Sequence, residues 1–240
     1  MPTSGAEATR TGATELGRTR LSPREGYRLW APSYEEETAV SALEDRVFRG
    51  VAPDNAGRRL LDVGCGTGRR IAADRQRTAL AIGLDLVPEM LLAGRRSGRA
   101  ITGIVADLRR MPIRAESFDQ VWCRLVIGHV PDLAGAYREL GRVTCAGGDL
   151  IVSDFHAAAV TAGHRRTFKD PFGGAREVQH HVHTPAEHVK AAEAAGWSHL
   201  ATVEAAAGQP EAWFYERAGR LEQLERERAL PLVVVLWLRR

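Results

Sequence analysis

The stretch that most constrains the fold is Leu60–Gly68, with the sequence Leu-Leu-Asp-Val-Gly-Cys-Gly-Thr-Gly. A short apolar run with one aspartate, Asp62, gives way to three glycines at alternate positions, Gly64, Gly66 and Gly68. Apolar residues that stop at a glycine-rich turn are typical of a buried strand that ends at a ligand. Glycine allows a tight bend there and lets a ligand approach the main chain without a Cβ in the way. We therefore expect a ligand-binding loop after a buried strand.

The residues around the loop indicate the kind of ligand. Residues 69–77 have the pattern of a helix, and residues 80–86 form a second apolar run that ends around Asp85. This order, with a carboxylate at the tip of the second strand, predicts half of a nucleotide-binding parallel sheet. A dinucleotide fingerprint would place its third glycine where this chain has Arg69. Asp62 would repel a phosphate and attract a sulfonium or ammonium group, so the spacing favours a cationic nucleoside without phosphates.

Leu61–Gly68 resembles the first motif of class I S-adenosylmethionine-dependent methyltransferases. Residues 118–153 resemble the ubiquinone/menaquinone and biotin-pathway branch of that family, methyltransferase type 11. The resemblance implies S-adenosylmethionine as cofactor, with Asp85 accepting hydrogen bonds from the ribose hydroxyls and Asp107 accepting one from the adenine amino group. The cofactor-binding residues that it implies are Tyr34, Asp62, Gly64, Cys65, Gly66, Gly68, Asp85, Leu86, Met90, Asp107 and Leu108.

A chain of 240 residues suits one α/β domain. Residues 1–20 have almost no large apolar side chains, so we expect a flexible tail there and a single domain over residues 21–240. Within that domain, residues 21–50 are expected to carry a lid helix and residues 155–183 to face the substrate. By the resemblance, the Ala31–Tyr34 segment belongs to the lid, with Tyr27 and Trp30 as possible walls of the site.

The patterning predicts a doubly wound, Rossmann-like α/β sheet of seven strands with helices on both faces. The resemblance implies that the last strand is antiparallel. The expected strands after the first two are 101–106, 120–127, 149–153, 198–205 and 232–238. The expected helices, besides 69–77, are 34–49 with Ser33 as its cap, 87–96, 133–143, 185–195 and 210–228.

Composition narrows the range of partners. The formal net charge of +3 does not require a nucleic-acid partner, and the arginines are scattered rather than gathered into a tract. The chain has three cysteines without zinc spacing and no apolar run of membrane-spanning length, so we expect a cytoplasmic protein. Amino-methylating DNA enzymes have an Asn or Asp followed by two prolines and an aromatic after the fourth strand, where this chain has Cys123–Val126. We therefore expect a small-molecule substrate and no nucleic acid.

Histidines gather in the irregular segment 155–183, which holds five of the 8 in the chain. A metal site is not favoured, because His181 and His183 would share a face without an acidic or cysteine partner nearby. Acid–base chemistry or substrate positioning is one use for such residues, and surface positions on a lid are the other. His129 and His156 follow the fourth and fifth strands, at the rim where the cofactor is expected, and are the candidate catalytic residues.

The predicted function is transfer of a methyl group from S-adenosylmethionine to a small-molecule acceptor. Carbon, oxygen and nitrogen methylation in quinone, acyl or secondary metabolism all remain open, and so does the oligomeric state. One alternative is an NAD(P)-dependent oxidoreductase, which the missing third glycine and Asp107 argue against. The other is a non-catalytic module that keeps the cofactor site.

Overall fold

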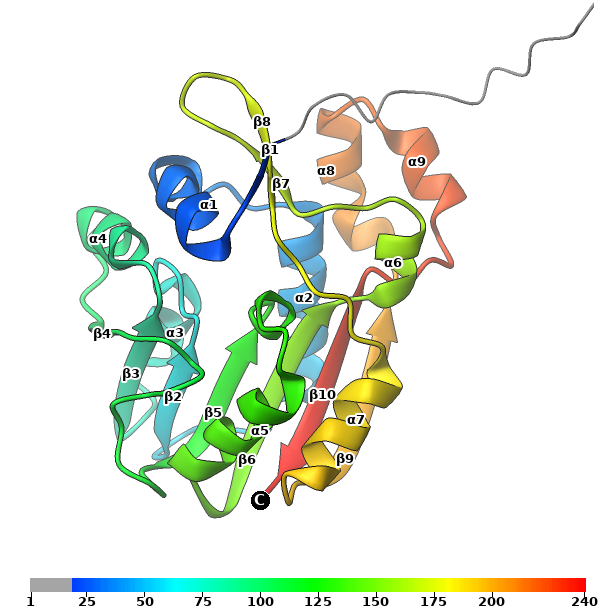
Figure 1. The fold of residues 1–240 in the computed structure, drawn as a ribbon. Helices are drawn as coiled ribbons and strands as arrows, with labels where there is room; N and C mark the ends of the chain where they lie inside the picture. The colour runs from blue at the N-terminus through cyan, green and yellow to red at the C-terminus, as the bar shows by residue number, and fades with distance from the viewer. Residues whose placement is uncertain (1–18) are drawn as a thin grey trace, which may run out of the picture.

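The computed structural model describes residues 19–240, in which a seven-stranded sheet forms the centre of the molecule (Figure 1). Its strand order is β4-β3-β2-β5-β6-β10-β9, and every pair from β4 to β6 is parallel. β10 pairs antiparallel with both β6 and β9. The strands are β2 (Arg59–Val63), β3 (Leu80–Asp85), β4 (Thr102–Val105), β5 (Phe118–Arg124), β6 (Thr144–Phe155), β9 (Ser198–Ala205) and β10 (Val233–Arg239). The predicted sheet, including its antiparallel last strand, is confirmed.

Helices cover both faces of this sheet. In Figure 1, α5 and α7 lie in front of the sheet and α2 lies behind it. The longer helices are α1 (Pro23–Trp30), α2 (Ala39–Val51), α4 (Pro88–Arg96), α5 (Leu133–Val143) and α7 (Pro185–Ala194). The shorter ones are α3 (Arg69–Asp74), α6 (Ala157–Thr161), α8 (Ala212–Arg217), α9 (Leu221–Arg226) and the 3-10 turns η1 (Ala31–Ser33), η2 (Ile127–His129) and η3 (Gln209–Glu211).

The two faces of the sheet form two separate apolar cores, because successive side chains of a strand point to opposite sides. Leu61, Val121 and Leu150 belong to the core that includes α5 and α7 residues. Their chain neighbours Leu60, Trp122 and Ile151 belong to the core that includes α2. Near-continuous apolar strands such as β2 and β10 are therefore covered on both sides, as in other parallel α/β sheets.

The N-terminal region differs from the prediction of one helix over residues 34–49. Ser22 caps an additional helix, α1, through a capping box with Glu25, and the turn η1 follows it with Pro32 in its first turn. α2 begins only at Ala39, because the Thr38 side chain accepts a hydrogen bond from the backbone N–H of Ser41 and so satisfies a helix-end donor. The prediction that Ser33 caps this helix is therefore wrong.

A second sheet, which the sequence did not predict, lies over the carboxyl ends of the main strands (Figure 1). Its order is β1-β8-β7, with β1 (Thr19–Leu21) parallel to β8 (Ala175–Val178) and β8 antiparallel to β7 (Thr167–Lys169). Residues 19–20 are thus part of a strand rather than of a tail. The rest of the expected tail, residues 1–18, lies outside the described residues. The segment 155–183 is more regular than expected, since it contains α6, β7 and β8.

The predicted helix 210–228 is two helices. Gly219 lies between α8 and α9 with a φ of 65°, a left-handed conformation that ends a helix. In this region Trp213 and Leu221 are exposed, while Tyr215 and Leu224 are buried. The break changes which residues of this region face the core.

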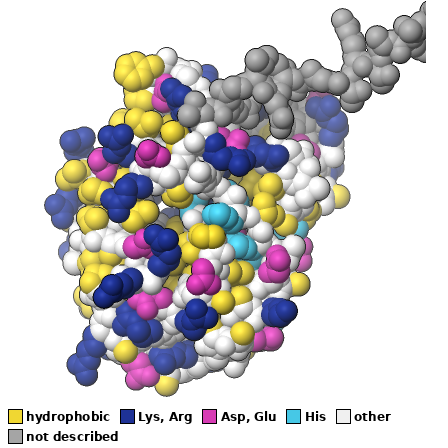
Figure 2. All heavy atoms as spheres, viewed as in Figure 1, with side chains coloured by type: hydrophobic (Ala, Val, Ile, Leu, Met, Phe, Trp, Pro, Cys, Tyr) yellow, Lys and Arg dark blue, Asp and Glu magenta, His cyan; other side chains and the backbone are white. Residues whose placement is uncertain are grey.

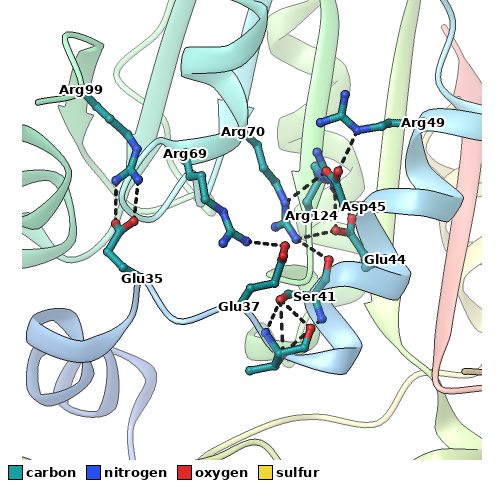
Figure 3. A network of polar contacts seen from close by, with 11 residues as sticks. Glu35, Glu37, Ser41, Glu44, Asp45, Arg49, Arg69, Arg70, Arg99 and Arg124 are labelled. Carbon is teal, nitrogen blue, oxygen red and sulfur yellow. Dashed lines mark hydrogen bonds and ion pairs between the residues drawn. The ribbon is translucent and has the colours of Figure 1, made fainter. Parts of the chain in front are cut away.

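A buried ionic network joins α2 to the sheet (Figure 3). The Glu44 carboxylate on α2 lies 2.9 Å from Arg124 Nη2 on β5 and 2.7 Å from Arg70 Nη2 on α3. It also accepts a hydrogen bond of 2.7 Å from Ser153 Oγ on β6. Burial opposes the ionisation of Glu44, but the two guanidinium groups outweigh it and lower its pKa. One carboxylate therefore connects four elements.

We predict that Glu44→Gln lowers the free energy of unfolding by about 3–5 kcal/mol, because it leaves the buried guanidinium groups of Arg70 and Arg124 with only the partly exposed carboxylate of Asp45 as counter-ion. Urea denaturation measures this. The matched control is Glu36→Gln, whose partner Arg217 lies 3.1 Å away in an exposed ion pair and whose loss should cost less than about 1 kcal/mol. Equal effects of the two substitutions would show that the buried network is not what holds α2 in place.

Candidate active site

The carboxyl ends of β2, β3 and β5 and the loop that follows β4 open into one large cavity of about 1450 Å³. Residues of α1, of η1 and of the segment 164–171 line it together with the residues that follow the strands. Sites for single small ligands are typically about 300–1000 Å³, so this volume leaves room for a cofactor and a second molecule. The place agrees with the general rule that open parallel sheets bind ligands at this edge.

All three loop glycines are in the left-handed conformation, with φ of 71° at Gly64, 59° at Gly66 and 73° at Gly68. Side chains other than glycine rarely adopt such angles. A Cβ at Gly64 would lie 2.2 Å from a methyl carbon of Val126, and one at Gly68 would lie 2.2 Å from a methyl carbon of Ile101. Glycine is therefore required at Gly64 and Gly68 for two reasons, the left-handed backbone conformation and the lack of space for a Cβ.

Asp85 holds the loop against β3. Its carboxylate accepts hydrogen bonds of 2.8 Å from the backbone N–H groups of Gly66 and Val87. Burial raises the pKa of Asp85 to about 6, and burial raises that of Asp62, on β2, to about 6 as well. Two buried carboxylates at the base of one loop create a negative potential that favours a cationic ligand.

Asp107 is in a different environment. Its carboxylate forms an exposed ion pair with Arg109 at 2.5 Å, and this interaction lowers the pKa of Asp107. Leu108, next to it, is buried. Both residues line the cavity.

The structure brings most of the sequence-predicted site residues together. Those that line the cavity are Tyr34, Gly64, Cys65, Gly66, Asp85, Leu86, Met90, Asp107, Leu108 and His129. Gly66 faces Met90 and Tyr34, since a Cβ built on it would lie 3.2 Å from Met90 Cε and 3.5 Å from Tyr34 Cε1. Asp62, Gly68 and His156 do not line the cavity.

His156 is also bound elsewhere. Its Nε2 lies 2.8 Å from a carboxylate oxygen of Glu204 on β9, and its Nδ1 accepts a hydrogen bond from the N–H of Ala158 at the start of α6. Both ring nitrogens are therefore engaged away from the cavity. These contacts favour a role for His156 as a helix cap rather than as a catalytic residue.

His129 stands in a chain of hydrogen bonds whose direction is fixed at both ends. Its Nδ1 lies 2.8 Å from the carbonyl oxygen of Gln179, which can only accept, so Nδ1 carries the proton. Its Nε2 must then accept from the Tyr27 hydroxyl at 3.0 Å, and that hydroxyl accepts from Arg166 Nη1 at 3.0 Å. Burial first, and Arg166 next, lower the pKa of His129 to about 3. The imidazole is neutral at physiological pH.

A second polar cluster lies behind this chain. Asp154, at the end of β6, is fully buried, and its carboxylate lies 3.1 Å from His180 Nε2 and 3.4 Å from His188 Nε2. The Tyr137 hydroxyl on α5 lies 2.9 Å from the other nitrogen of His188. Burial opposes the ionisation of Asp154, yet the two imidazoles hold its pKa below the ordinary value. These contacts fix the histidine segment to the sheet.

Arg166 and the partners of His180 could not be found from the sequence. Neither belongs to a motif, and Asp154 is separated from His180 by 26 residues. The close packing of His180 shows only in the structure, where a Cβ at Gly128, which follows β5, would lie 2.1 Å from His180 Nε2. On the face shown in Figure 2, histidine side chains lie near the middle, and acidic and basic side chains are interspersed around them.

Within residues 19–240, no group of three or more His, Cys, Asp or Glu side chains is arranged to hold a metal ion. In the same range, no helix has the length and apolar character needed to cross a membrane.

Residues 61–152 match the family model of a methyltransferase domain. The malonyl-(acyl-carrier protein) O-methyltransferase of Serratia marcescens is 32% identical over 130 residues, which are 54% of this chain and 51% of that protein. The ubiquinone biosynthesis O-methyltransferase of Hahella chejuensis is 38% identical over 103 residues, 40% of this chain and 43% of that protein. The solved S-adenosylmethionine dependent methyltransferase from Mesorhizobium loti superposes with a TM-score of 0.67 at 23% identity, covering 84% of this chain and 100% of that one.

These comparisons confirm the predicted resemblance to S-adenosylmethionine-dependent methyltransferases and the predicted Rossmann-like fold. They also support S-adenosylmethionine as the cofactor. The chain spans about half the length of the curated relatives it matches.

We predict that S-adenosylmethionine binds about tenfold more weakly at pH 5 than at pH 8. Asp85 has a pKa of about 6, so it is ionised at pH 8 and largely protonated at pH 5. The charged form is the one that attracts a sulfonium and accepts hydroxyl hydrogen bonds, so affinity is lost as the pH falls through 6. Calorimetric titration at both pH values measures the change. Asp85→Asn should bind S-adenosylmethionine weakly, and its affinity should depend less on pH. If the pH dependence of this variant equals that of the wild type, Asp85 does not cause it.

Proposed function

We propose that this chain is an S-adenosylmethionine-dependent methyltransferase of class EC 2.1.1 that acts on a small-molecule acceptor. The observation that carries the proposal is the loop of three left-handed glycines, held by the buried Asp85 and opening into the large cavity. The domain match over residues 61–152 supports it. Both curated relatives described above are named as O-methyltransferases, which favours oxygen as the methylated atom.

The cofactor would lie along the carboxyl ends of β2, β3 and β4. Gly64, Cys65 and Gly66 would contact it through the main chain, and Asp85 would receive the ribose hydroxyls on the lone pairs that Gly66 and Val87 leave unused. Leu86 and Leu108 would flank the adenine. Asp107 would receive the adenine amino group. Tyr34 and Met90 would cover the loop at Gly66.

S-adenosylmethionine supplies an electrophilic methyl group on a sulfonium. The protein must hold the acceptor in line with that methyl group and exclude water, and orientation alone can lower a barrier by several kcal/mol, up to about 7–11. Tyr27, Trp30 and Tyr34 form the aromatic side of the cavity, where Tyr27 stacks on Trp30 with ring centroids 5.7 Å apart. Trp30 in turn stacks on Phe168 at 4.9 Å, which joins the N-terminal lid to the second sheet.

His129 would act through Tyr27. Because the Tyr27 hydroxyl donates to His129 Nε2, a proton released by an acceptor hydroxyl can pass to the Tyr27 oxygen while Tyr27 passes its own proton to the imidazole. Tyr27 is the group nearest to the acceptor in this scheme, and His129 receives the proton. Because burial and Arg166 lower the pKa of His129 to about 3, the transfer requires a bound acceptor whose negative charge offsets the positive charge of Arg166. His156 has no part in it.

Two observations support a proposal for the cellular location of the enzyme and for the class of its acceptor. The three cysteines are unpaired thiols, which suits the reducing cytoplasm. The cavity has room for an acceptor of quinone, acyl or secondary metabolism beside the cofactor. We propose a cytoplasmic enzyme of that kind, with no nucleic-acid substrate.

The proposal predicts that S-adenosylhomocysteine binds with micromolar affinity in calorimetric titration, whereas NAD and NADP do not bind. Asp85→Ala should weaken binding by about 1.5–3 kcal/mol, the value of a hydrogen bond to a charged group. Binding of NAD instead of the thioether nucleoside would refute the assignment of the loop.

We further predict that His129→Ala and Tyr27→Phe each lower turnover about 10²–10⁴-fold, the usual range for acid–base catalysis, with little change in affinity for S-adenosylhomocysteine. Release of S-adenosylhomocysteine measures turnover with any acceptor found by screening. If the two residues act in one relay, the double variant should be little worse than either single one. Full activity of both single variants would exclude the relay.

A further inference from the structure

Arg166 has fewer partners than a guanidinium group in this position requires. It has five N–H donors, of which one is accounted for by the hydrogen bond from Nη1 to the Tyr27 hydroxyl. Its Nε is buried without any hydrogen-bond partner. Among the described residues, no carboxylate lies within 4.0 Å of it. An unpaired N–H group that is shielded from water destabilises the folded state, and a charged one does so more strongly.

The other partly or fully buried guanidinium groups of the cavity lining are all paired. Arg70 and Arg124 contact Glu44, and Arg69 contacts Glu37 at 3.5 Å. Arg166 alone of this set, within residues 19–240, faces the cavity with neither a carboxylate partner nor an exposed position. The pattern is that of a charge whose partner is a ligand.

Arg166 lies at the acceptor end of the cavity. Gly66 of the cofactor loop faces Tyr34, whose ring centroid lies 5.8 Å from that of Tyr27, and Tyr27 contacts Arg166 directly. Two aromatic rings thus separate the guanidinium from the cofactor loop. The same rings place Arg166 beside the Tyr27–His129 pair, where the reacting group of the acceptor is expected.

We propose that Arg166 binds a carboxylate of the methyl acceptor, so that the substrate is an organic acid rather than a neutral molecule. Arginine is suited to this because its planar donors match the two oxygens of a carboxylate. Nη2 has no hydrogen-bond partner among the described residues and, unlike Nε, is not closed off from solvent. The inference rests on the proposed function, since it assigns the acceptor side of the same site.

The test compares matched acids and amides on the full chain saturated with S-adenosylhomocysteine. The pairs are benzoate and benzamide, 4-hydroxybenzoate and 4-hydroxybenzamide, and hexanoate and hexanamide, titrated by calorimetry. The wild type should bind the acid at least tenfold more tightly than the amide in one or more pairs. Arg166→Gln should reduce that preference to less than threefold, while Arg166→Lys should retain part of it. Arg220→Gln, at an exposed arginine of the same cavity lining, is the matched control and should keep the full preference.

Equal binding of acids and amides by the wild type, failure of every acid to bind, or a preference that survives Arg166→Gln would each overturn the inference. So would a loss of tenfold or more in the affinity of Arg166→Gln for S-adenosylhomocysteine, because Arg166 would then bind the carboxylate of the cofactor itself. Failure of the wild type to bind S-adenosylhomocysteine at all is a separate result that refutes the proposed function.

Discussion

The buried carboxylate of Glu44 is the interaction on which the floor of the site depends. It joins α2, α3, β5 and β6 through Arg70, Arg124 and Ser153. Ser153 Oγ also accepts a hydrogen bond from the N–H of Leu125, which has a φ of 56° and lines the cavity. A left-handed leucine is strained and persists only where its surroundings hold it. The ionic network therefore fixes both the attachment of α2 and the backbone that follows β5.

The two ends of the cavity are built by different means. At the end where we propose that the cofactor binds, the surface is mostly main chain: three glycines provide the loop conformation, and Asp85 on β3 accepts a hydrogen bond from the loop. At the other end, where we propose that the acceptor binds, side chains from α1, η2 and the segment 164–181 line the cavity. A main-chain site tolerates little variation in sequence, whereas a site made of side chains on separate segments can change its ligand by single substitutions.

This division explains what the sequence could predict. The strands and most helices of the main sheet follow from local periodicity and from capping signals such as Thr184 and Glu187, and the glycine loop has a motif. The sheet β1-β8-β7 is harder to predict, because its strands have only three or four residues. β7 and β8 form a local hairpin, but β1 pairs with β8 over more than 150 positions. The contacts of Arg166 with Tyr27 and of Asp154 with His180 are also long-range, and spacing along the chain does not encode them.

The hydrogen bonds around Tyr27 connect helix α1 to the residues of the proposed proton relay. Arg166 can only donate and the Gln179 carbonyl can only accept, so the chain between them has one polarity: from Arg166 to Tyr27, from Tyr27 to His129, and from His129 to Gln179. Tyr27 belongs to α1, whereas Arg166 and Gln179 flank the hairpin β7–β8. Moving α1 away from the hairpin would break the hydrogen bond of Tyr27 to His129, on which the proposed relay depends, and would separate Arg166 from Tyr27. The contacts between α1 and the hairpin are thus the same contacts that orient the hydrogen bonds of His129, so the proposed proton relay would exist only while α1 lies against the hairpin.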